Sequence, residues 1–417
     1  MDIAVIGGGV SGMIAAICAA GQGADVTIFE HMPRIGKKLL LTGSGKCNLS
    51  NTDMDISHFH GGDKGVIEAV LGACDDKATR SFFEKLGIYF RDKGGYLYPY
   101  CEQASAVLDV LRFTIRDMGI DVHTGTDIKM IDKISMSQDR ETEDRFVVIT
   151  SEGKLSFDRV IICTGSAANR NTGSDGTGYS LAKSLGHSLV KPLPALTYLV
   201  CDEGFYPSIA GIRTMATVSL YAGKGEEEIR LLGEEYGQVQ FTKTGISGIC
   251  VFNLSHLAVA AMDAGREVRA AIDFLPDISK DLIRDHIKNR IDNNPQRPVE
   301  ELFAGLFAKP LGILIAKRCS LDLKKRCDMI TSSELLDLCR MIKGFETLVT
   351  SYGDTENCQV MQGGVRLSEV KDTLESRLVS GLYFAGEILD VHGDCGGYNL
   401  QWAASSGMLA GRSCITG

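Results

Sequence analysis

The chain has 417 residues, a hydrophobic fraction of 44% and a formal net charge of −9 at pH 7. A chain of this length is expected to form two or three domains rather than a single core. The acidic balance argues against nucleic acid or an anionic membrane as a partner, because either would require a concentrated basic face.

Thirteen cysteines are present without any Cys-x-x-Cys pair, and most of them lie within apolar runs. This pattern is typical of reduced core thiols in a cytoplasmic protein rather than of a disulfide framework. The apolar N-terminus carries Asp2 where a secretion signal would carry basic residues. No apolar run approaches the ~18 residues that a membrane-spanning helix needs. We therefore expect a cytoplasmic protein without a membrane partner.

Residues 2–31 contain every part of a dinucleotide-binding unit. An apolar strand, Ile3–Ile6, leads into Gly-x-Gly-x-x-Gly at positions 7–12, and an Ala-rich helix and a second strand, Val26–Phe29, follow. The glycines permit a tight turn, close approach to a pyrophosphate and close packing of helix on strand, while the acid after the second strand can accept ribose hydroxyls. The cofactor contacts predicted here are Gly7, Gly9, Val10, Ser11, Gly12, Glu30 and His31.

A basic, glycine-rich loop follows at residues 34–51. Its cations can neutralise a pyrophosphate, and its glycine-rich part can lie along a flat ring system. The cofactor contacts predicted in this loop are Arg34, Lys37, Lys38, Gly43, Gly45, Lys46, Cys47 and Asn48.

The next part of the chain combines helices with short strands. Apolar residues recur at helical spacing over 65–87 and 105–118, and a strand is expected at 120–123. A hairpin of 146–150 with 154–157 leads to an apolar strand at 160–163. We predict that Thr164 and Gly165, where this strand stops, approach the phosphates, and that the backbone of Ile128 meets the adenine ring.

The composition changes after about residue 191, where Pro192 and Pro194 mark a junction. Strands are predicted at 214–221, 230–232 and 239–241, with a charged turn at 224–228, and helices are predicted at 280–291, 299–307 and 333–342. We therefore predict an inserted β domain at 191–250, open to completion by strands after 265, and a mainly helical insert at 251–350.

Nucleotide-domain character returns near the C-terminus. A buried strand at 382–384 ends in Ala-Gly-Glu, and Gly-Gly-Tyr-Asn at 396–399 opens a helix that runs to about 414. Placed against the pyrimidine edge of a flavin, the free amides of this helix would stabilise reduced, negatively charged flavin. A second strand end and a glycine-led helix at one nucleotide site favour FAD. The predicted contacts are Gly386, Glu387, Gly397, Tyr398, Asn399 and Leu400.

Three stretches together resemble the BaiN-like flavoproteins, a family of bacterial NAD(P)/FAD-dependent oxidoreductases that also includes enzymes described as aminoacetone oxidases. They are residues 34–51, which contain Lys-Cys-Asn, residues 172–187, and residues 381–402, which contain Gly-Gly-Tyr-Asn-Leu-Gln-Trp. The resemblance spans the chain and implies an α/β fold. A discontinuous two-dinucleotide-binding (Rossmann-like) FAD domain at 1–190 and 351–417 would be interrupted by the β domain and the small helical domain.

By the same resemblance we expect an FAD-dependent ene-reductase that reduces an activated C=C bond of a small-molecule substrate, an enone of bile-acid or steroid type. Only one Gly-x-Gly-x-x-Gly motif is present, so NAD(P)H is expected as a transient electron donor. Tyr398 and Lys46 are the candidate catalytic residues, as proton donor or carbonyl polariser. The sequence leaves the catalytic acid and the oligomeric state open.

Two other interpretations stay open. The family likeness also allows an FAD-dependent amine or aminoketone oxidase that uses oxygen. A flavoprotein with structural FAD, acting as a binding module for a partner such as RNA, belongs to another class, and the acidic charge weighs against RNA.

Two further features are interpreted as structural. Cys47 and Cys395 lie in glycine-rich loops, but a thiol-disulfide mechanism needs a closely paired cysteine and a lowered thiol pKa. His58 and His60 form His-x-His in a glycine-rich loop without further spaced ligands, a pattern typical of exposed side chains. We therefore predict no metal site.

Overall fold

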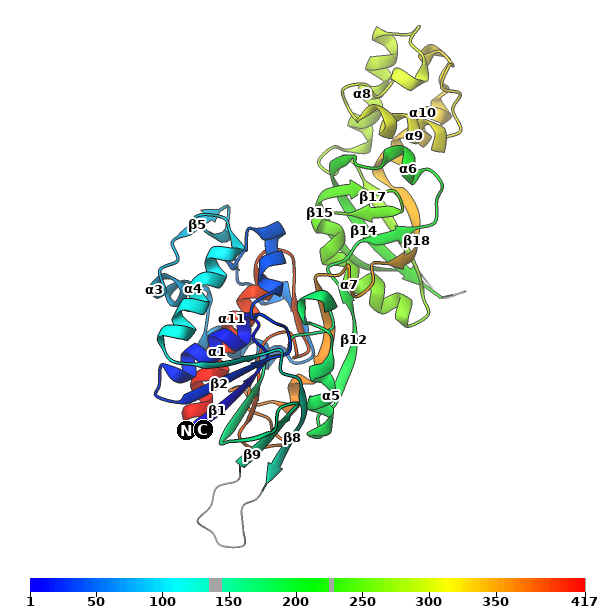
Figure 1. The fold of residues 1–417 in the computed structure, drawn as a ribbon. Coiled ribbons are helices and arrows are strands. Elements are labelled where there is room, and N and C mark those ends of the chain that lie inside the picture. The colour runs from blue at the N-terminus through cyan, green and yellow to red at the C-terminus, as the bar shows by residue number, and fades with distance from the viewer. Residues whose placement is uncertain (135–144, 225–228, 417) are drawn as a thin grey trace. The chain divides into compact units, whose positions relative to one another are not determined.

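The computed structural model describes residues 1–134, 145–224 and 229–416 and divides into two compact units. Unit 1 consists of Met1–Pro194 with Thr355–Gly417, and unit 2 is the intervening segment Ala195–Asp354 (Figure 1). The first boundary lies after Pro194 rather than at 190, because strand β12 (Leu189–Ala195) pairs with β19 (Val360–Val365) of unit 1.

A five-stranded parallel sheet forms the centre of unit 1. Its strand order is β20-β11-β1-β2-β7, and all four pairings are parallel. The strands are β1 (Asp2–Ile6), β2 (Asp25–Glu30), β7 (Asp121–Thr124), β11 (Arg159–Ile162) and β20 (Leu382–Phe384). The apolar side chains of β1, β11 and β20 are buried, as expected for a parallel sheet covered on both faces. Because β20 comes from the C-terminal segment, the sheet is completed by the two ends of the chain.

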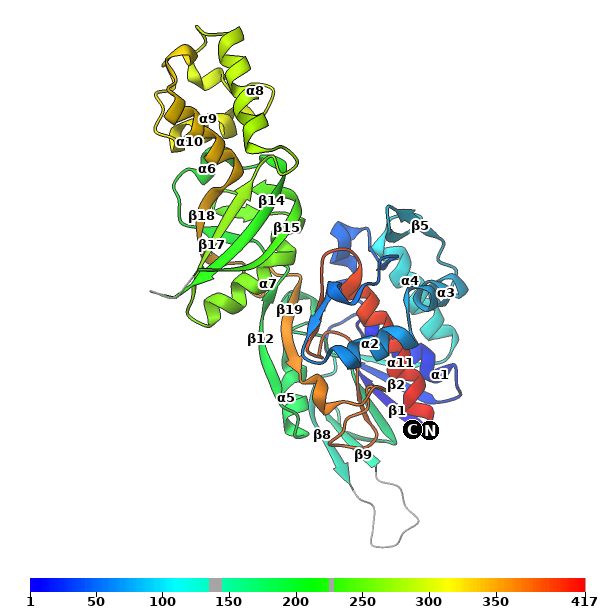
Figure 2. The same ribbon diagram turned by 180° about the vertical axis from the view of Figure 1, so that it is seen from behind.

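Helix α1 (Val10–Ala20) packs along α11 (Tyr398–Thr416), and the two lie side by side in both views (Figures 1 and 2). Glycines permit this close approach. A Cβ added to Gly411 would meet the backbone oxygen of Ala15 at 2.3 Å, and one added to Gly407 would meet that of Ser11 at 2.6 Å. The predicted C-terminal helix is therefore confirmed. Its packing on α1 holds the C-terminal segment against the N-terminal segment of unit 1.

The other elements of unit 1 surround this sheet. The helices are α2 (Lys64–Ala73), α3 (Asp76–Lys85), α4 (Ala104–Asp117), α5 (Thr177–Ser184) and the short η1 (Lys38–Gly45), η2 (Ile56–His58), η3 (Arg170–Thr172) and η6 (Leu367–Glu369). The strands are β3 (Ser50–Asn51), β4 (Phe59–Gly61), β5 (Phe90–Lys93), β6 (Tyr96–Pro99), β8 (Ile128–Ile134), β9 (Arg145–Thr150), β10 (Lys154–Phe157) and β21 (Val391–Gly393). They form the small sheets β10-β9-β8, β3-β6-β5 and β21-β4. The helical run predicted over 65–87 is two helices, because Asp75 caps α3 by accepting a hydrogen bond from Ala78 N–H at 2.7 Å.

Unit 2 contains a closed barrel in the order β13-β16-β15-β14-β17-β18. Its strands are β13 (Leu199–Cys201), β14 (Arg213–Gly223), β15 (Arg230–Phe241), β16 (Gly245–Ser247), β17 (Glu267–Asp273) and β18 (Phe345–Tyr352). Its helices are α6 (Tyr206–Ile209), α7 (Ile249–Asp263), α8 (Lys280–Asn293), α9 (Lys309–Arg318), α10 (Ser332–Lys343) and the short η4 (Val299–Glu301) and η5 (Cys327–Met329). The two strands after 265 close the barrel and remove its exposed edges, so 251–350 is not an independent helical domain.

Two sequence predictions for unit 2 are wrong. The strands expected at 230–232 and 239–241 are one strand, β15, because it pairs with β14 along almost its whole length. The helix expected at 299–307 is only a short turn at Val299–Glu301, and Gly305 interrupts the rest with a φ of +85°. The turn expected at 224–228 lies mostly outside the described residues. Within the ranges that the structure describes, every helix is too short or too polar to cross a lipid bilayer.

Candidate functional site

The carboxyl ends of β1, β2, β11 and β20 bring the predicted cofactor loops of unit 1 together. Gly7 N–H donates to Phe29 O at 2.7 Å, Cys163 N–H donates to Ile6 O at 2.7 Å, and Ala385 N–H donates to Ile162 O at 3.1 Å. In open parallel sheets ligands bind outside these strand ends, where the direction of strand addition reverses. Here β1 lies between β11 and β2, which makes its end that reversal point.

The turn between β1 and α1 has the geometry of a phosphate cradle. Gly7 has a φ of +106°, and a Cβ added to it would meet Cys163 O at 2.5 Å. A Cβ on Gly12 would meet Gly7 O at 2.0 Å, whereas a Cβ on Gly9 would meet nothing within 4 Å. Gly9 is the N-cap of α1, and no side chain caps this helix. The start of α1 therefore has amides without a side-chain cap next to a glycine with free space around it, as binding of a pyrophosphate requires.

The carboxylate of Glu30 is fixed at the end of β2. It accepts hydrogen bonds from Gly8 N–H and Met32 N–H, both at 2.8 Å. These bonds use one lone pair on each oxygen and leave acceptor capacity for ribose hydroxyls. His31 follows Glu30 and lies close to Gly173, because a Cβ added to Gly173 would lie 3.0 Å from the Nε2 atom of His31.

The segment that leads to Ile128 lies against the same strand end. Thr126 N–H donates to Glu30 O at 3.0 Å, and Ile128 is the half-buried first residue of β8. The contact of its backbone with the adenine ring stays a prediction.

Two lysines of the basic loop link it to the third family-like stretch and to the residue directly before the second. Lys38 Nζ lies 2.6 Å from Glu387 Oε2, which also accepts a hydrogen bond from Ser166 Oγ at 3.0 Å. Lys37 Nζ donates to Asn171 O. Ser166 and Asn171 were not predicted from the sequence, because nothing local marks them. Arg34 is exposed, so it remains available to a phosphate.

The loop from Gly43 to Asn48 is built for a close approach of backbone to a ligand. Gly43, Gly45 and Cys47 all have positive φ, at +54°, +85° and +59°. Within the described residues, Asn48 Oδ1 and Thr164 Oγ1 are buried without a hydrogen-bond partner. Buried polar atoms are normally paired, so Asn48 Oδ1 marks a place where a ligand would supply the missing partner, whereas Thr164 Oγ1 packs against Gly178, where an added Cβ would lie 1.8 Å from it. Gly165 follows Thr164 with a φ of +72°.

The third stretch returns to the same place through two glycines. Gly386 has a φ of +81°, and a Cβ on it would meet Ser11 Oγ at 2.4 Å; a Cβ on Gly397 would meet Ser50 O at 2.5 Å. Asn399 holds the loop before α11, because its Oδ1 accepts from Gly393 N–H at 2.8 Å and its Nδ2 donates to Gly393 O at 2.7 Å. The half-buried Leu400 follows in the first turn of the helix.

These observations fit FAD. The open glycine cradle and the backbone of Thr164 and Gly165 would hold the pyrophosphate, Glu30 the ribose, and Asn48 and the backbone of Gly397 to Leu400 the flavin half. When bound, FAD supplies two-electron hydride chemistry. The chain's own residues therefore bind and orient the cofactor and must provide the protons.

The two candidate catalytic residues lie in different surroundings. Tyr398 is 4% exposed, with its ring stacked on His58 at a centroid distance of 4.4 Å and edge-on to Phe59. Burial raises the pKa of Tyr398, so the phenol stays protonated. Lys46 has a side chain that is 57% exposed and lies 3.8 Å from Glu102. Neither geometry by itself identifies a proton donor.

The thiol hypothesis finds no support in the described residues. Cys47 is fully buried, and this burial raises its pKa to about 12, so it is not a nucleophilic thiolate at neutral pH. Cys395 is half-buried. The described part of the chain also contains no group of three or more His, Cys, Asp or Glu side chains placed to hold a metal ion.

The interpretation of His58 and His60 as exposed side chains is wrong. Both are half-buried, and both rings contact the carboxylate of Asp394. His58 is the last residue of η2 and His60 lies in β4, and their close spacing in the sequence was the only signal for a shared partner. The partner itself comes from the far end of the chain.

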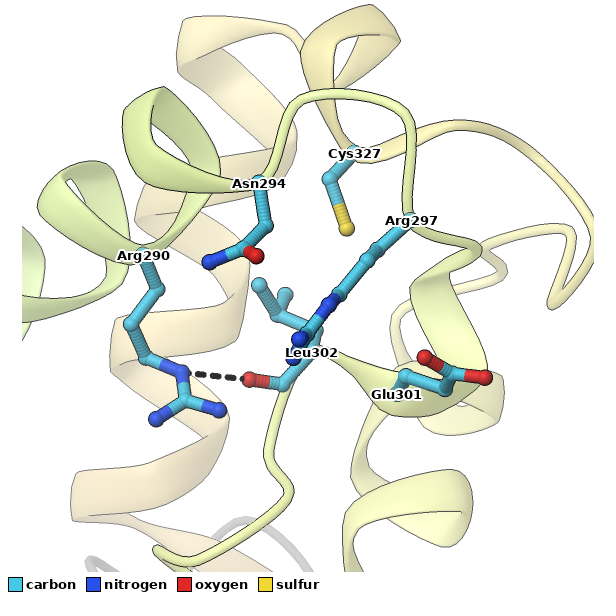
Figure 3. A pocket seen from close by; sticks show the side chains of 6 residues that line it. All are labelled: Arg290, Asn294, Arg297, Glu301, Leu302 and Cys327. Carbon is cyan, nitrogen blue, oxygen red and sulfur yellow. Dashed lines mark hydrogen bonds between the residues drawn. The ribbon is translucent and has the colours of Figure 1, made fainter.

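A pocket in the helical part of unit 2 contains none of the predicted site residues. It is lined by Arg290, Asn294, Arg297, Glu301, Leu302 and Cys327 (Figure 3). Arg290 Nε donates to Leu302 O at 2.8 Å and its Nη2 donates to Ala304 O at 2.6 Å. The guanidinium thus satisfies the carbonyls of an irregular segment, which is a structural role.

The parallel sheet, the glycine cradle at its reversal point and the C-terminal return to it define a Rossmann-type, FAD-dependent oxidoreductase. The chain belongs to the HI0933-like family, whose model, described as "HI0933-like protein Rossmann domain", matches residues 1–413. The predicted family and fold class are thereby confirmed.

Comparisons with individual proteins agree with this assignment. The chain is 37% identical to the "3-dehydro-bile acid delta(4,6)-reductase" of Clostridium scindens, over 99% of this chain and 98% of that protein. It is 26% identical to the "Ribosomal RNA dihydrouridine synthase" of Haemophilus influenzae, over 96% and 95%. Its fold is similar to that of 3-ketosteroid delta1-dehydrogenase from Sterolibacterium denitrificans, with a TM-score of 0.51 at 11% identity over 100% and 99% of the two chains.

Proposed function

We propose that the protein uses FAD, reduced by NAD(P)H, to saturate a C=C bond conjugated with a carbonyl group in a small apolar molecule, an enone of bile-acid or steroid type. The observation that carries this proposal is the 37% identity to a bile-acid reductase over 99% of the chain. The three family-like stretches that meet at the strand ends of unit 1 are consistent with it.

The second relative supports the type of reaction more than the substrate. Dihydrouridine is uridine whose C5=C6 bond, conjugated with the C4 carbonyl, has been saturated. The names of both relatives therefore describe the reduction of a C=C bond next to a carbonyl carbon. Such a reduction needs a hydride at the β carbon and a proton at the α carbon.

The residues of this chain have defined tasks in such a reaction. Glu30 and the amides at the start of α1 anchor the nucleotide, and the Lys38–Glu387 pair links the basic loop to the third stretch. The amides at the start of α11 stabilise negative charge on the ring system that they face. The proton must come from a group that is protonated at neutral pH.

Anaerobic spectrophotometry tests the proposal. FAD-loaded protein is mixed with NADH or NADPH, and then with a 3-oxo-4-ene steroid such as testosterone. We expect one nicotinamide to bleach the flavin and the steroid to restore its yellow colour with formation of the saturated ketone. Flavin that stays oxidised with both nicotinamides contradicts the reductase. Bleaching by aminoacetone with peroxide release in air would instead establish the amine oxidase.

Reduction of uridine in ribosomal RNA is the second candidate function. The 26% identity to a ribosomal RNA dihydrouridine synthase over 96% of the chain favours it, whereas the net charge of −9 does not. Reduced protein is mixed with ribosomal RNA lacking dihydrouridine, and the RNA is analysed by mass spectrometry for a gain of two hydrogens. Reoxidation of the flavin by this RNA but not by the steroid would replace the small-molecule proposal.

A further inference from the structure

A cluster of titratable side chains lies directly before α11, and the cofactor assignments above do not use it. Asp394, which follows β21, lies with Oδ2 3.0 Å from His58 Nδ1 and with Oδ1 2.8 Å from His60 Nε2. Its backbone N–H donates to His58 O at 2.9 Å. The antiparallel pairing of β21 with β4 sets this register, with His392 opposite His60 and Gly393 opposite Phe59. Both ends of the chain therefore build the cluster.

The ring of His58 is held in one plane. It stacks on Tyr398, with a centroid distance of 4.4 Å and an interplanar angle of 17°. Tyr398 is the first residue of α11 and belongs to the stretch predicted to hold the flavin half of the cofactor. His58 is therefore oriented on two sides, by a carboxylate in its ring plane and by an aromatic face.

The two ring nitrogens of His58 differ in how firmly they are held. Nδ1 faces Asp394, whose side chain is 17% exposed. Nε2 lies 3.3 Å from Asp53, whose side chain is 66% exposed and can move away at little cost. A carboxylate on Nδ1 that leaves Nε2 accessible is the arrangement in which catalytic histidines transfer protons.

The surrounding charges favour the protonated ring. The titratable groups around His58 are Asp53, Asp55, His60, Lys64, Asp394 and Tyr398, so three carboxylates oppose one ammonium group. Burial alone would lower the pKa of His58, but the hydrogen bonds to Asp394 and Asp53 outweigh it and raise the pKa. For Asp394, burial would raise the pKa, but the hydrogen bonds to His60 and His58 lower it.

We propose that His58 is the general acid of the reduction, with Nε2 as the nitrogen that releases the proton, and that Asp394 is the positioning residue that orients the ring through Nδ1. This inference rests on the proposed reduction of a conjugated C=C bond. It gives an explicit role to a residue that sequence reasoning had set aside.

The β carbon of the enone receives a hydride from reduced flavin, and the α carbon receives the proton on His58 Nε2. One C=C bond is lost and two C–H bonds form, while the imidazolium becomes neutral imidazole and the N–H bond to the proton breaks. Solvent then reprotonates the ring, and NAD(P)H restores the reduced flavin.

The test separates the two half-reactions. FAD-loaded wild type, His58→Gln, Asp394→Asn and His286→Gln are reduced with dithionite and mixed with testosterone in a stopped-flow instrument. His286 is an exposed histidine of α8 and serves as the matched control. We expect His58→Gln to reoxidise about 10²-fold or more slowly, the order of general acid catalysis, with FAD affinity and reduction by NAD(P)H unchanged. His286→Gln should behave as wild type.

Two readouts distinguish an acid from a structural residue. The rate of reoxidation should fall at alkaline pH in the wild type, and Asp394→Asn should move this fall to lower pH. Histidine NMR of the FAD-loaded protein should show the same downward shift in the pKa of His58, without any turnover. If the steroid reoxidises the wild type and His58→Gln is reoxidised at the same rate, the role of His58 is overturned but the proposed function stands. Wild type that no enone reoxidises overturns the proposed function and the inference with it.

Discussion

Replacing Gly411 by alanine tests whether the contact between α1 and α11 holds unit 1 together. A Cβ at this position would lie 2.3 Å from Ala15 O and 2.9 Å from Ala15 C and Cα, where ordinary contacts begin at 3.4 Å. All three atoms are backbone, so neither helix can relieve the overlap by turning a side chain. Overpacking of this kind costs about 1–3 kcal/mol, and we expect the upper end of that range here.

Helix propensity acts in the opposite direction, and a control variant removes it. Glycine to alanine inside a helix stabilises by about 1 kcal/mol. Gly72 of α2 provides the matched site, because a Cβ there would meet nothing within 4 Å. We therefore expect Gly72→Ala to be about 1 kcal/mol more stable than wild type and Gly411→Ala about 2 kcal/mol less stable. The difference of about 3 kcal/mol measures the packing cost alone.

Urea unfolding followed by tryptophan fluorescence provides the assay. Trp402 is the only tryptophan of the chain, lies in α11 and is 1% exposed, so its emission reports the unfolding of unit 1. The free energy of unfolding follows from the midpoint and the slope of the transition. If Gly411→Ala unfolds at the same or a higher urea concentration than Gly72→Ala, the two helices do not pack as described.

Three more predictions follow from named contacts. Glu30→Gln should weaken FAD binding by about 10- to 100-fold, because hydrogen bonds to a charged group contribute about 1.5–3 kcal/mol. Titration of the FAD-free protein with FAD measures this affinity, with Asp25→Asn at the start of β2 as the control. Equal FAD affinity of the two variants would contradict the role of Glu30. Lys38→Met and Glu387→Gln should each destabilise, and their double-mutant cycle should give a coupling of about 0.5–3 kcal/mol; strictly additive urea midpoints would show that the pair contributes nothing. The raised pKa of His58 stabilises the fold below the ordinary value of 6.5, and this stability is lost as the pH rises through the raised pKa. The lowered pKa of Asp394 stabilises the fold above the ordinary value of 3.8, and this stability is lost on acidification. The difference in unfolding free energy between wild type and Asp394→Asn should therefore be largest between pH 3.8 and 6.5 and shrink by pH 8.5, and a constant difference would refute the ion pair.

The parts of the site that sequence reasoning located are those where a local requirement fixes the residue type. Gly7 and Gly12 must be glycine because a Cβ would collide with backbone atoms, and both positions lie within one strand-turn-helix unit. The strand β20 and the helix α11 were likewise found from local signals, an apolar run and a glycine-led start. Neighbouring residues in the sequence carry all the information for such elements.

Elements whose form depends on a distant partner were predicted less well. Residues 233–238 look irregular alone, yet they continue β15 because β14 offers a paired edge throughout. The closure of the barrel depends on β18, which pairs with β17 from Ile272 with Phe345 onward and with β13 through Cys201 and Val349, all distant in the sequence. No local pattern encodes which strand edges pair. The sequence could therefore predict strands and helices in the insert, but not that the strands form a closed barrel.

The His58–Asp394 pair shows the same limit at the level of chemistry. The two residues are separated by 336 positions, and the hydrogen bond between them exists only because β4 and β21 pair in one register. His58 directly precedes β4 and Asp394 directly follows β21, so a shift of that register by one residue would displace the two side chains relative to each other. The His-x-His spacing could predict that two imidazoles lie near each other, but not that a carboxylate would orient one of them. The orientation of His58 is thus a property of the assembled fold, and substitutions that slip the β4–β21 register should abolish its contact with Asp394, and with it part of the upward shift in its pKa, even when every residue of the cluster is retained.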